Sequence, residues 1–540
     1  MRTRSINHHF GRETCWTFSG SLSAIIFLTV NAILVGDALA QTPLFLWAKA
    51  AGGINIDSGR AIALDGSGNS FVTGYFDSTN VTFGTTTLAN SASDGSDEIF
   101  VAKYDRDGNV LWARSAGGTN YDKGAGIAVD GGGNCYVTGS FQGPASFSGT
   151  ILTNAAGMFH AKYDSAGNVV WVARAVGLEY ASVSGGTGVS LDASANCYVT
   201  GNSFGQYIAF AGATNSITLT NNDNGSAAFV AKYDSSGNVV WAALAVTVTS
   251  RSVAADAVGN SYVAGNFGYF ATFGTITLTN VNTSGFPDAF VAKYDSSGDV
   301  LWAKSAGGPE ADYGMAIASD GSGCHVTGSY SAPCTFGGVT LTNGGIFIAK
   351  YDSSGNMFWA KSAGSGSDSS SGIAVDGAAN CYVTGNYSGP STFGGITLTN
   401  TGLFVAKYDS SGNVPWAKTA VGSTRGNAIA ADSVGNCYVA GGLYYSGTFD
   451  NITLTDSGNN PNADILVTKI GRPWVKILRN ASQLTFAWTT NVTGFALESA
   501  TNLPAGANWT AVTNTPVRVG DQFTVTNSIS GTNKFYRLRK

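Results

Sequence analysis

The sequence predicts an all-β fold: a seven-bladed β-propeller with four-stranded blades, in which an N-terminal strand closes the last blade, plus a small C-terminal β-sandwich-like domain. The first observation behind this prediction is a Trp that returns seven times within one repeated phrase. The spacings between these tryptophans are 57 to 70 residues, and the residues are Trp47, Trp112, Trp171, Trp241, Trp302, Trp359 and Trp416. Such self-similarity is the sequence signature of a repeat architecture.

The second observation is that four strand-like phrases recur in fixed order, which we call strands A to D. In the sixth copy they span 372–376, 381–385, 404–409 and 414–418. They are short, rich in β-branched and aromatic residues, and bounded by Gly, Asn, Asp and Ser. The A–B and C–D links read Asp-x-x-Gly-Asn, in which Asp opens a type I turn and Gly takes the left-handed position. Each repeat is therefore predicted to be a four-stranded meander that packs on its neighbours.

The third observation is a displaced strand. The last C strand, 465–470, is not followed by a D strand, whereas a D-like phrase at 44–50 precedes the first A strand. We expect this N-terminal strand to complete the seventh blade, which closes a ring and removes exposed sheet edges. A linear solenoid is the alternative, but it would need capping repeats.

These recurring phrases resemble a known repeat. W-A-K-S-A-G-G, N-C-Y-V-T-G, T-F-G-G-x-T-L-T-N and F-V-A-K-Y-D-S-S-G-N follow one another in fixed order over about residues 44–470. They resemble the bacterial SBBP-type β-propeller repeat, which implies a secreted or cell-surface protein without assigned catalytic residues. The C-terminal segment, with G-F-x-L-E-S-A-T-N-L and F-Y-R-L-R phrases, looks like a fibronectin- or immunoglobulin-like domain.

The predicted domain boundaries are 1–40, 41–471 and 472–540, for a signal peptide, the propeller and the C-terminal domain. Residues 1–40 carry Arg2, Arg4 and Arg12, an apolar stretch at 22–35 and a small-x-small site ending at Ala40, which is the pattern of a secretory signal. We therefore expect a bacterial chain that is exported to the cell surface or released. No other run reaches 18 apolar residues, so no membrane span is expected in the mature chain.

The amino-acid composition limits which classes of partner are expected. Only 12% of residues are charged and the formal net charge is −5, so nucleic acid is not an expected partner. Five cysteines occupy one repeated B-strand position and are predicted to be small buried residues. Cys334 lies outside that position, and a Cys324–Cys334 disulfide remains an alternative.

A catalytic centre is not evident in the sequence. His160 and His325 are the only histidines after residue 40, and both replace packing residues of strands. We predict packing roles for them, and likewise for the seven tryptophans, whose phrase resembles the interblade docking motif of quinoprotein propellers. No cofactor is expected. Asp105, Asp107 and Asn109 form a weak candidate Ca²⁺ loop, with a plain turn as the alternative.

Better candidates lie in the D-to-A and B-to-C connections, which share one face of a propeller that we call the rim face. Asp57, Asp122, Asp312 and Asp368 stand at equivalent places in D-to-A connections. They could bind a ligand at the channel mouth, or each could cap its own loop by accepting backbone N–H bonds. The long B-to-C connections vary in length and predict a binding surface.

Together these features favour a non-catalytic binding or structural module for an extracellular protein or polysaccharide. The alternative is an extracellular polysaccharide lyase or hydrolase with its site at the channel rim, since propellers host both classes.

Overall fold

A computed structural model gives the structure of this protein. It describes residues 31–32, 42–92, 95–153, 156–280, 282, 284–458, 462–472, 475–480, 483–489, 495–500, 508–519, 522–528 and 535–539. Apart from strand β1 (Asn31–Ala32), the predicted signal peptide lies outside these residues. The chain divides into two compact units, one of Trp47–Lys469 and one of Met1–Leu46 with Ile470–Lys540.

Strand pairing within the described residues gives seven antiparallel meanders, each in the order A, B, C, D. Blades 1 to 3 are β3 (Asp57–Leu64), β4 (Ser70–Phe76), β7 (Glu98–Tyr104) and β8 (Val110–Gly118); β9 (Lys123–Val129), β10 (Cys135–Gln142), β13 (Ala156–Tyr163) and β14 (Val169–Leu178); and β15 (Ser182–Leu191), β16 (Cys197–Phe204), β19 (Ser226–Tyr233) and the first part of β20 (Val239–Ala255).

Blades 4 to 7 continue this order. Their strands are the rest of β20, β21 (Ser261–Phe273), β23 (Asp288–Tyr294) and β24 (Val300–Gly307); β25 (Asp312–Ser319), β26 (Gly323–Tyr330), β29 (Gly345–Asp352) and β30 (Met357–Ala363); β31 (Ser369–Val375), β32 (Cys381–Ser388), β35 (Thr401–Tyr408) and the start of β36 (Trp416–Ala431); and the end of β36, β37 (Cys437–Phe449), β39 (Ala463–Gly471) and β2 (Leu44–Ala51).

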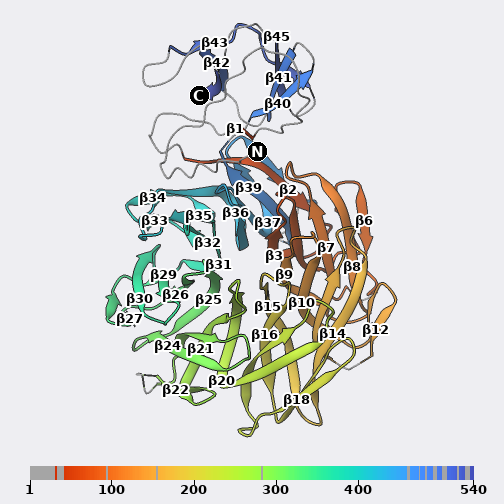
Figure 1. The fold of residues 1–540 in the computed structure, drawn as a ribbon, viewed down its shortest axis with the longest axis vertical. Helices are drawn as coiled ribbons and strands as arrows, with labels where there is room; N and C mark the ends of the chain where they lie inside the picture. Colours follow the sequence, from red (N-terminus) through yellow and green to blue (C-terminus); the bar gives the residue numbers. More distant parts are fainter. Residues whose placement is uncertain are drawn as a thin grey trace, which may run out of the picture. The chain divides into compact units, whose positions relative to one another are not determined.

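The seven A strands contact one another in cyclic order, and the A strand of blade 7 in β36 contacts β3 of blade 1. Figure 1 shows these strands around the centre of the propeller. The N-terminal strand β2 pairs with β39, and the Thr468 hydroxyl donates to the Trp47 carbonyl at 2.7 Å. The predicted closure of the last blade is therefore confirmed, and a linear solenoid is excluded.

Each Trp from the first to the sixth docks on the C–D turn of the blade that follows it. Trp112 Nε1 donates to the Ser165 carbonyl at 3.1 Å. Gly167 of the same turn has φ +84°, and a Cβ added to it would lie 2.8 Å from the indole. The same donor contact is made by Trp47, Trp171, Trp241, Trp302 and Trp359. The predicted interblade packing role of the tryptophans is confirmed for these six.

Every B-to-C connection contains a further hairpin at the periphery of the propeller (Figure 1). The hairpins are β5 (Asn80–Phe83) with β6 (Thr86–Ala89), β11 (Ala145–Phe147) with β12 (Thr150–Leu152), β17 (Tyr207–Ala211) with β18 (Ser216–Thr220), the end of β21 with β22 (Ile276–Thr279), β27 (Cys334–Phe336) with β28 (Val339–Leu341), β33 (Ser391–Phe393) with β34 (Ile396–Leu398), and the end of β37 with β38 (Ile452–Thr455).

Five of these hairpins extend the sheet of the preceding blade, whereas β5 with β6 and β33 with β34 form two-stranded sheets of their own. β11 of blade 2 pairs with the D strand β8 of blade 1, and β17 of blade 3 pairs with β14 of blade 2. Their Phe side chains are buried: Phe147 packs on Phe159 with ring centroids 4.9 Å apart. Pairing protects the outer sheet edge. The part of each B-to-C connection that is free to bind a partner is therefore smaller than the sequence indicated.

The C-terminal unit contains two sheets. One has the order β1, β40 (Val475–Asn480), β41 (Gln483–Thr489), β45 (Gln522–Ser528) and β44 (Val517–Val519), and the other β43 (Thr510–Ala511), β42 (Ala496–Ala500) and β46 (Phe535–Arg539). Phe486 of the first sheet packs on Tyr536 of the second, with ring centroids 4.4 Å apart. The unit is a small β-sandwich.

Two further features bear on the sequence predictions. Cys324 and Cys334 are both buried and free, as are the other four described cysteines, so the alternative Cys324–Cys334 disulfide is not formed. Among the described residues, no helix reaches the length and apolarity needed to cross a membrane.

Candidate functional site on the rim face

The four rim aspartates are buried, and each accepts hydrogen bonds from its own D-to-A connection, from the end of the following strand B, or from both. Asp122 Oδ2 accepts from the Gly118 N–H at 2.8 Å, and its Oδ1 accepts from the Gln142 N–H at 2.9 Å. Asp57 accepts in the same way from the Gly53 N–H and from the Ser78 hydroxyl, each at 2.8 Å. These bonds tie the D-to-A connection to the end of strand B.

Asp368 follows the same pattern, whereas Asp312 Oδ2 is buried without a hydrogen-bond partner among the described residues. Asp312 accepts from the Ser331 N–H at 3.1 Å, and Asp368 accepts from the Ser365 N–H at 2.6 Å and from the Ser391 hydroxyl. The geometry is that of loop capping, the second of the two roles considered from the sequence. It places all four side chains inside the loops and offers no support for a ligand site made from them.

Enclosure of these carboxyls changes their ionisation. Burial raises the pKa of Asp57, Asp122 and Asp312 from the usual value near 4 to about 7, against the opposing effect of the hydrogen bonds that they accept. A carboxyl with such a pKa could act as a general acid or base. In this structure the carboxyl oxygens of Asp57 and Asp122 already accept hydrogen bonds from nearby residues of the rim face.

The candidate Ca²⁺ loop is a tight turn in the structure. Asp105 Oδ1 accepts from the backbone N–H groups of Asp107 and Asn109 at 2.9 and 2.8 Å, and Asp105 Oδ2 accepts from the Asn109 amide. Asp164 makes the same bonds in the next blade. Within the described residues, no group of three His, Cys, Asp or Glu side chains could hold a metal ion. Calcium binding at this loop remains a prediction without support from the geometry.

Both histidines lie inside the propeller. His160 packs against Trp171 and Tyr233, with ring centroids 5.1 and 5.3 Å away, and burial lowers its pKa to about 3. His325 is also fully buried, and burial lowers its pKa to about 4. The packing roles predicted for them agree with these positions.

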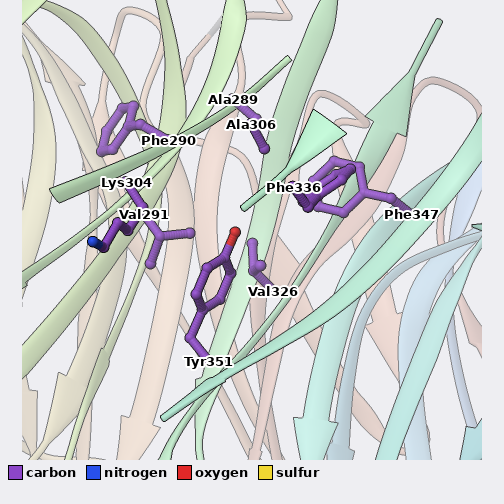
Figure 2. A pocket seen from close by; sticks show the side chains of 9 residues that line it. All are labelled: Ala289, Phe290, Val291, Lys304, Ala306, Val326, Phe336, Phe347 and Tyr351. Atoms are coloured by element: carbon purple, nitrogen blue, oxygen red, sulfur yellow. The ribbon is translucent and has the colours of Figure 1, made fainter. Parts of the chain in front are cut away.

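An enclosed cavity between blades 4 and 5 is too small for a substrate. It has a volume of about 10 Å³, which is roughly the space for one water molecule. Figure 2 shows that its lining is mainly apolar, with the Tyr351 hydroxyl pointing inward beside Val291 and Val326. We assign no function to this cavity.

The rim face presents features that sequence reasoning missed. Leu178, Tyr180 and Phe204 come from the connection between blades 2 and 3 and from the end of β16, and 40%, 100% and 57% of their surfaces are exposed. A hollow between blades 3 and 4 lies beside the exposed Tyr269 and Phe270. These residues fall in the least repetitive parts of the chain, so comparison of the repeats carries no signal for them.

Comparison with known proteins places the chain near WD repeat proteins without showing a family. No family model matches it. An uncharacterized WD repeat-containing protein of Acanthamoeba polyphaga mimivirus is 27% identical over 503 residues, covering 73% of this chain and 36% of that protein. The chain thus spans only about a third of that relative.

Two solved structures are also similar. The WD40 repeats of RRP9 have a TM-score of 0.41 and 9% identity, covering 80% of this chain and 99% of that one. The Dos1 propeller has a TM-score of 0.38 and 9% identity, covering 79% and 95%.

The predicted relationship to the bacterial SBBP-type repeat is wrong, because the curated relative is a WD repeat-containing protein. The reason is physical. The quoted phrases encode strands, Asp-x-x-Gly-Asn turns and the Trp that docks on the next blade, and these are needed to stack four-stranded blades. They therefore identify the propeller but do not tell one repeat family from another. The fibronectin- or immunoglobulin-like assignment of the C-terminal domain also finds no support in the comparisons.

Proposed function

We propose that this chain is a non-catalytic β-propeller scaffold that holds a protein partner on its rim face. The observation that carries the proposal is the apolar patch of Leu178, Tyr180 and Phe204, which we call the blade 3 patch. Its Tyr180 is fully exposed. Exposed large apolar side chains that gather on one face of a soluble protein are typical of interaction sites.

The blade 3 patch is held by the strands beneath it. Ser182 pairs with Phe204 across β15 and β16, and Leu178 pairs with Tyr207 across β14 and β17. The Ala181 N–H donates to the Leu178 carbonyl at 3.0 Å, which closes the turn that carries Tyr180. Aromatic side chains on such a fixed turn provide contact area with little loss of conformational entropy on binding.

Site-specific photocrosslinking tests this proposal. A benzophenone side chain placed at position 180 in cells that produce the chain should crosslink to one protein, and Phe204→Ala should reduce that crosslink at least several-fold. A benzophenone at position 434 is the matched control, because Val434 is 75% exposed but lies in an A–B turn on the opposite face. Equal crosslinking to the same proteins from both positions would contradict the proposal.

We also infer export to the cell surface or beyond. The support is the sequence of residues 1–40, with its basic start, apolar stretch and Ala38-Leu39-Ala40 site. N-terminal sequencing of the mature chain should begin at Gln41. A mature chain that starts at Met1 or Arg2 and remains in the cytosolic fraction would overturn this inference.

No specific observation favours the alternative of a polysaccharide lyase or hydrolase. Such an enzyme needs titratable groups that converge on a substrate, and the four rim aspartates are each enclosed by the loops of separate blades.

A further inference from the structure

The seven A strands surround the axis of the propeller (Figure 1), and the charged side chains that they expose are all basic. Within these strands the exposed residues are two serines and three arginines, namely Ser182, Ser184, Arg60, Arg251 and Arg425. The acids of the same strands, Asp57 and Asp312, are buried. The inner edge of the ring is therefore positively charged, although the formal net charge of the whole chain is −5.

Two of these arginines occupy a β-bulge that recurs in the A strands. The register of β3 on β4 shifts between Gly59 and Ala61, so Arg60 is the extra residue, and the register of β20 on β21 shifts in the same way around Arg251. A β-bulge changes the direction of a side chain. In blade 7 the bulge residue is Asn427, whose amide donates to the Gly59 carbonyl of blade 1 at 2.8 Å. The bulge of an A strand therefore lies where one blade meets the next.

Arg60 and Arg425 come from the same junction between blades. Their strands, β3 and β36, contact each other. Arg60 follows Gly59, which accepts the hydrogen bond from Asn427, and Arg425 stands two residues before Asn427. The side chains of the two arginines thus start from neighbouring points of adjoining A strands.

Each of these two guanidinium groups lies over a tyrosine ring. Arg60 Cζ is 5.8 Å from the ring centroid of Tyr75, and Arg425 Cζ is 5.1 Å from that of Tyr444. Tyr75 stands next to the last residue of strand B in β4, and B strands end at the rim face. A guanidinium that packs on an aromatic face keeps its N–H edge available for a ligand. The two groups are therefore directed to the rim face.

The ring of A strands is narrow at the residue that follows the bulge. A Cβ added to Gly126 of blade 2 would lie 3.1 Å from the Cα of Gly188 in blade 3, and one added to Gly372 of blade 6 would lie 3.0 Å from the Cα of Ala428 in blade 7. Neighbouring A strands are thus in backbone contact. Side chains as long as Arg can therefore reach one small area around the axis from several blades, and Arg251 of blade 4 joins the other two there.

The three arginines have no acidic partner among the described residues. Lys123 on the same face pairs with Asp97 at 2.9 Å, but no ion pair of the described residues includes Arg60, Arg251 or Arg425. Like charges that gather without acids repel one another, and a bound anion would remove this repulsion. Guanidinium groups bind carboxylate and phosphate through two parallel hydrogen bonds.

We propose that these three residues, which we call the axial arginines, form a site on the rim face for a small multivalent anion, a molecule with two or more carboxylate or phosphate groups. Arg60 and Arg425 hold one group at the junction of blades 7 and 1, and Arg251 holds a second from blade 4. The narrow ring beneath them restricts the ligand to a small molecule. The axial arginines share no residue with the blade 3 patch, so the two proposals can fail separately.

Titration calorimetry on the full chain at low ionic strength tests the site. The probes are citrate in one arm and tripolyphosphate in the other, with acetate as the monovalent control. Binding in either arm is expected, and the tighter arm identifies the anionic group. The affinity should fall as salt is added, because salt screens exposed charges. Absence of binding in both arms, or equal affinity for acetate, would overturn the proposal.

Variants then locate the site. Arg60→Gln, Arg425→Gln and Arg251→Gln should each weaken binding at least tenfold. Lys361→Gln is the matched control, because it removes the same charge from an exposed residue of the outermost strand β30, and it should leave the affinity unchanged. Equal weakening by Lys361→Gln would reduce the effect to net charge and overturn the assignment.

A variant with an added acid guards against a fold defect. Ala125 is the half-buried bulge residue of blade 2, next to the blade of Arg60. Ala125→Glu supplies a carboxylate at the ring, so it should raise the melting temperature relative to Ala125→Gln and weaken citrate or tripolyphosphate binding at least tenfold. Ala125→Gln has a side chain of the same size and should bind at least tenfold more tightly than Ala125→Glu. Equal affinities of the two folded variants would also overturn the proposal.

Discussion

Trp47 Nε1 donates a hydrogen bond to the Arg106 carbonyl at 3.1 Å, and this contact closes the propeller. Trp47 stands in the N-terminal strand, which belongs to blade 7, and Arg106 stands in the C–D turn of blade 1. Gly108 of that turn approaches the indole as closely as Gly167 approaches Trp112, since an added Cβ would lie 2.8 Å from the indole in both cases. Closure of the propeller thus repeats the contact that joins consecutive blades.

We expect Trp47→Ala to destabilise the propeller as strongly as Trp112→Ala. Trp47 is 5% exposed and Trp112 is 8% exposed, and removal of a buried Trp costs about 3–5 kcal/mol. The measurement is the midpoint of urea unfolding, followed by Trp fluorescence and circular dichroism.

Trp416→Ala is the matched control for this change. Blade 7 takes its C and D strands from opposite ends of the chain, so Trp416 has no following C–D turn on which to dock. Trp416→Ala should therefore lower the midpoint of urea unfolding less than Trp47→Ala does. An unchanged midpoint for Trp47→Ala would refute the closure contact.

Gly167→Ala should destabilise the junction of blades 1 and 2. The residue has φ +84°, and the new methyl group would meet the Trp112 indole at 2.8 Å. The left-handed conformation alone costs about 1–2 kcal/mol for a residue other than Gly, and the contact with the indole adds to this. Thermal unfolding should show a lower midpoint.

Gly131→Ala provides the comparison, because Gly131 lies in an A–B turn where an added Cβ meets no atom within 4 Å. This variant should unfold within about 0.5 kcal/mol of the natural chain. Similar losses for the two Gly variants would argue against a specific fit of Gly167 to Trp112.

The repeat made the fold predictable, and the same regularity hid the candidate sites. Trp112, Gly167 and their equivalents recur because every interblade junction needs the same fit, so a single sequence displays them several times. Asp57 and Asp122 also recur, and their recurrence reflects the capping of similar loops. Tyr180 differs: its full exposure depends on neighbours that are distant in sequence, so only the three-dimensional structure reveals it.

The peripheral hairpins should behave as structural elements. Phe147 of β11 is fully buried against Phe159, so Phe147→Ala should lower the free energy of unfolding by about 3–5 kcal/mol. Ile151 of β12 is 58% exposed in the same hairpin, and Ile151→Ala should change it by no more than about 0.5 kcal/mol. Urea unfolding measures both. A loss at Phe147 as small as that at Ile151 would indicate a hairpin that contributes only a surface loop.

The rim aspartates should make stability depend on pH in a direction opposite to that of ordinary surface carboxylates. Burial raises the pKa of Asp122 to about 7 in the folded chain, whereas its usual value is 3.8. The folded state therefore binds more protons than the unfolded state between about pH 4 and pH 7, and the free energy of unfolding falls as the pH rises through this range. The buried histidines have the opposite effect on the free energy of unfolding, because burial lowers their pKa. The pH dependence of the natural chain by itself therefore does not test Asp122.

The difference between Asp122→Asn and the natural chain isolates this group. The variant has no proton to lose, so its free energy of unfolding, relative to that of the natural chain, should rise steadily from about pH 4 to pH 7. Asp164→Asn is the control, because the hydrogen bonds from Asn168 hold the pKa of Asp164 below its usual value. Asp164 therefore titrates below about pH 4, and the difference in free energy of unfolding between Asp164→Asn and the natural chain should stay constant from about pH 4 to pH 7. Urea unfolding at a series of pH values measures both. A constant difference for Asp122→Asn would show that this carboxyl is ionised throughout the range, and that the hydrogen bonds from Gly118 and Gln142 outweigh its burial.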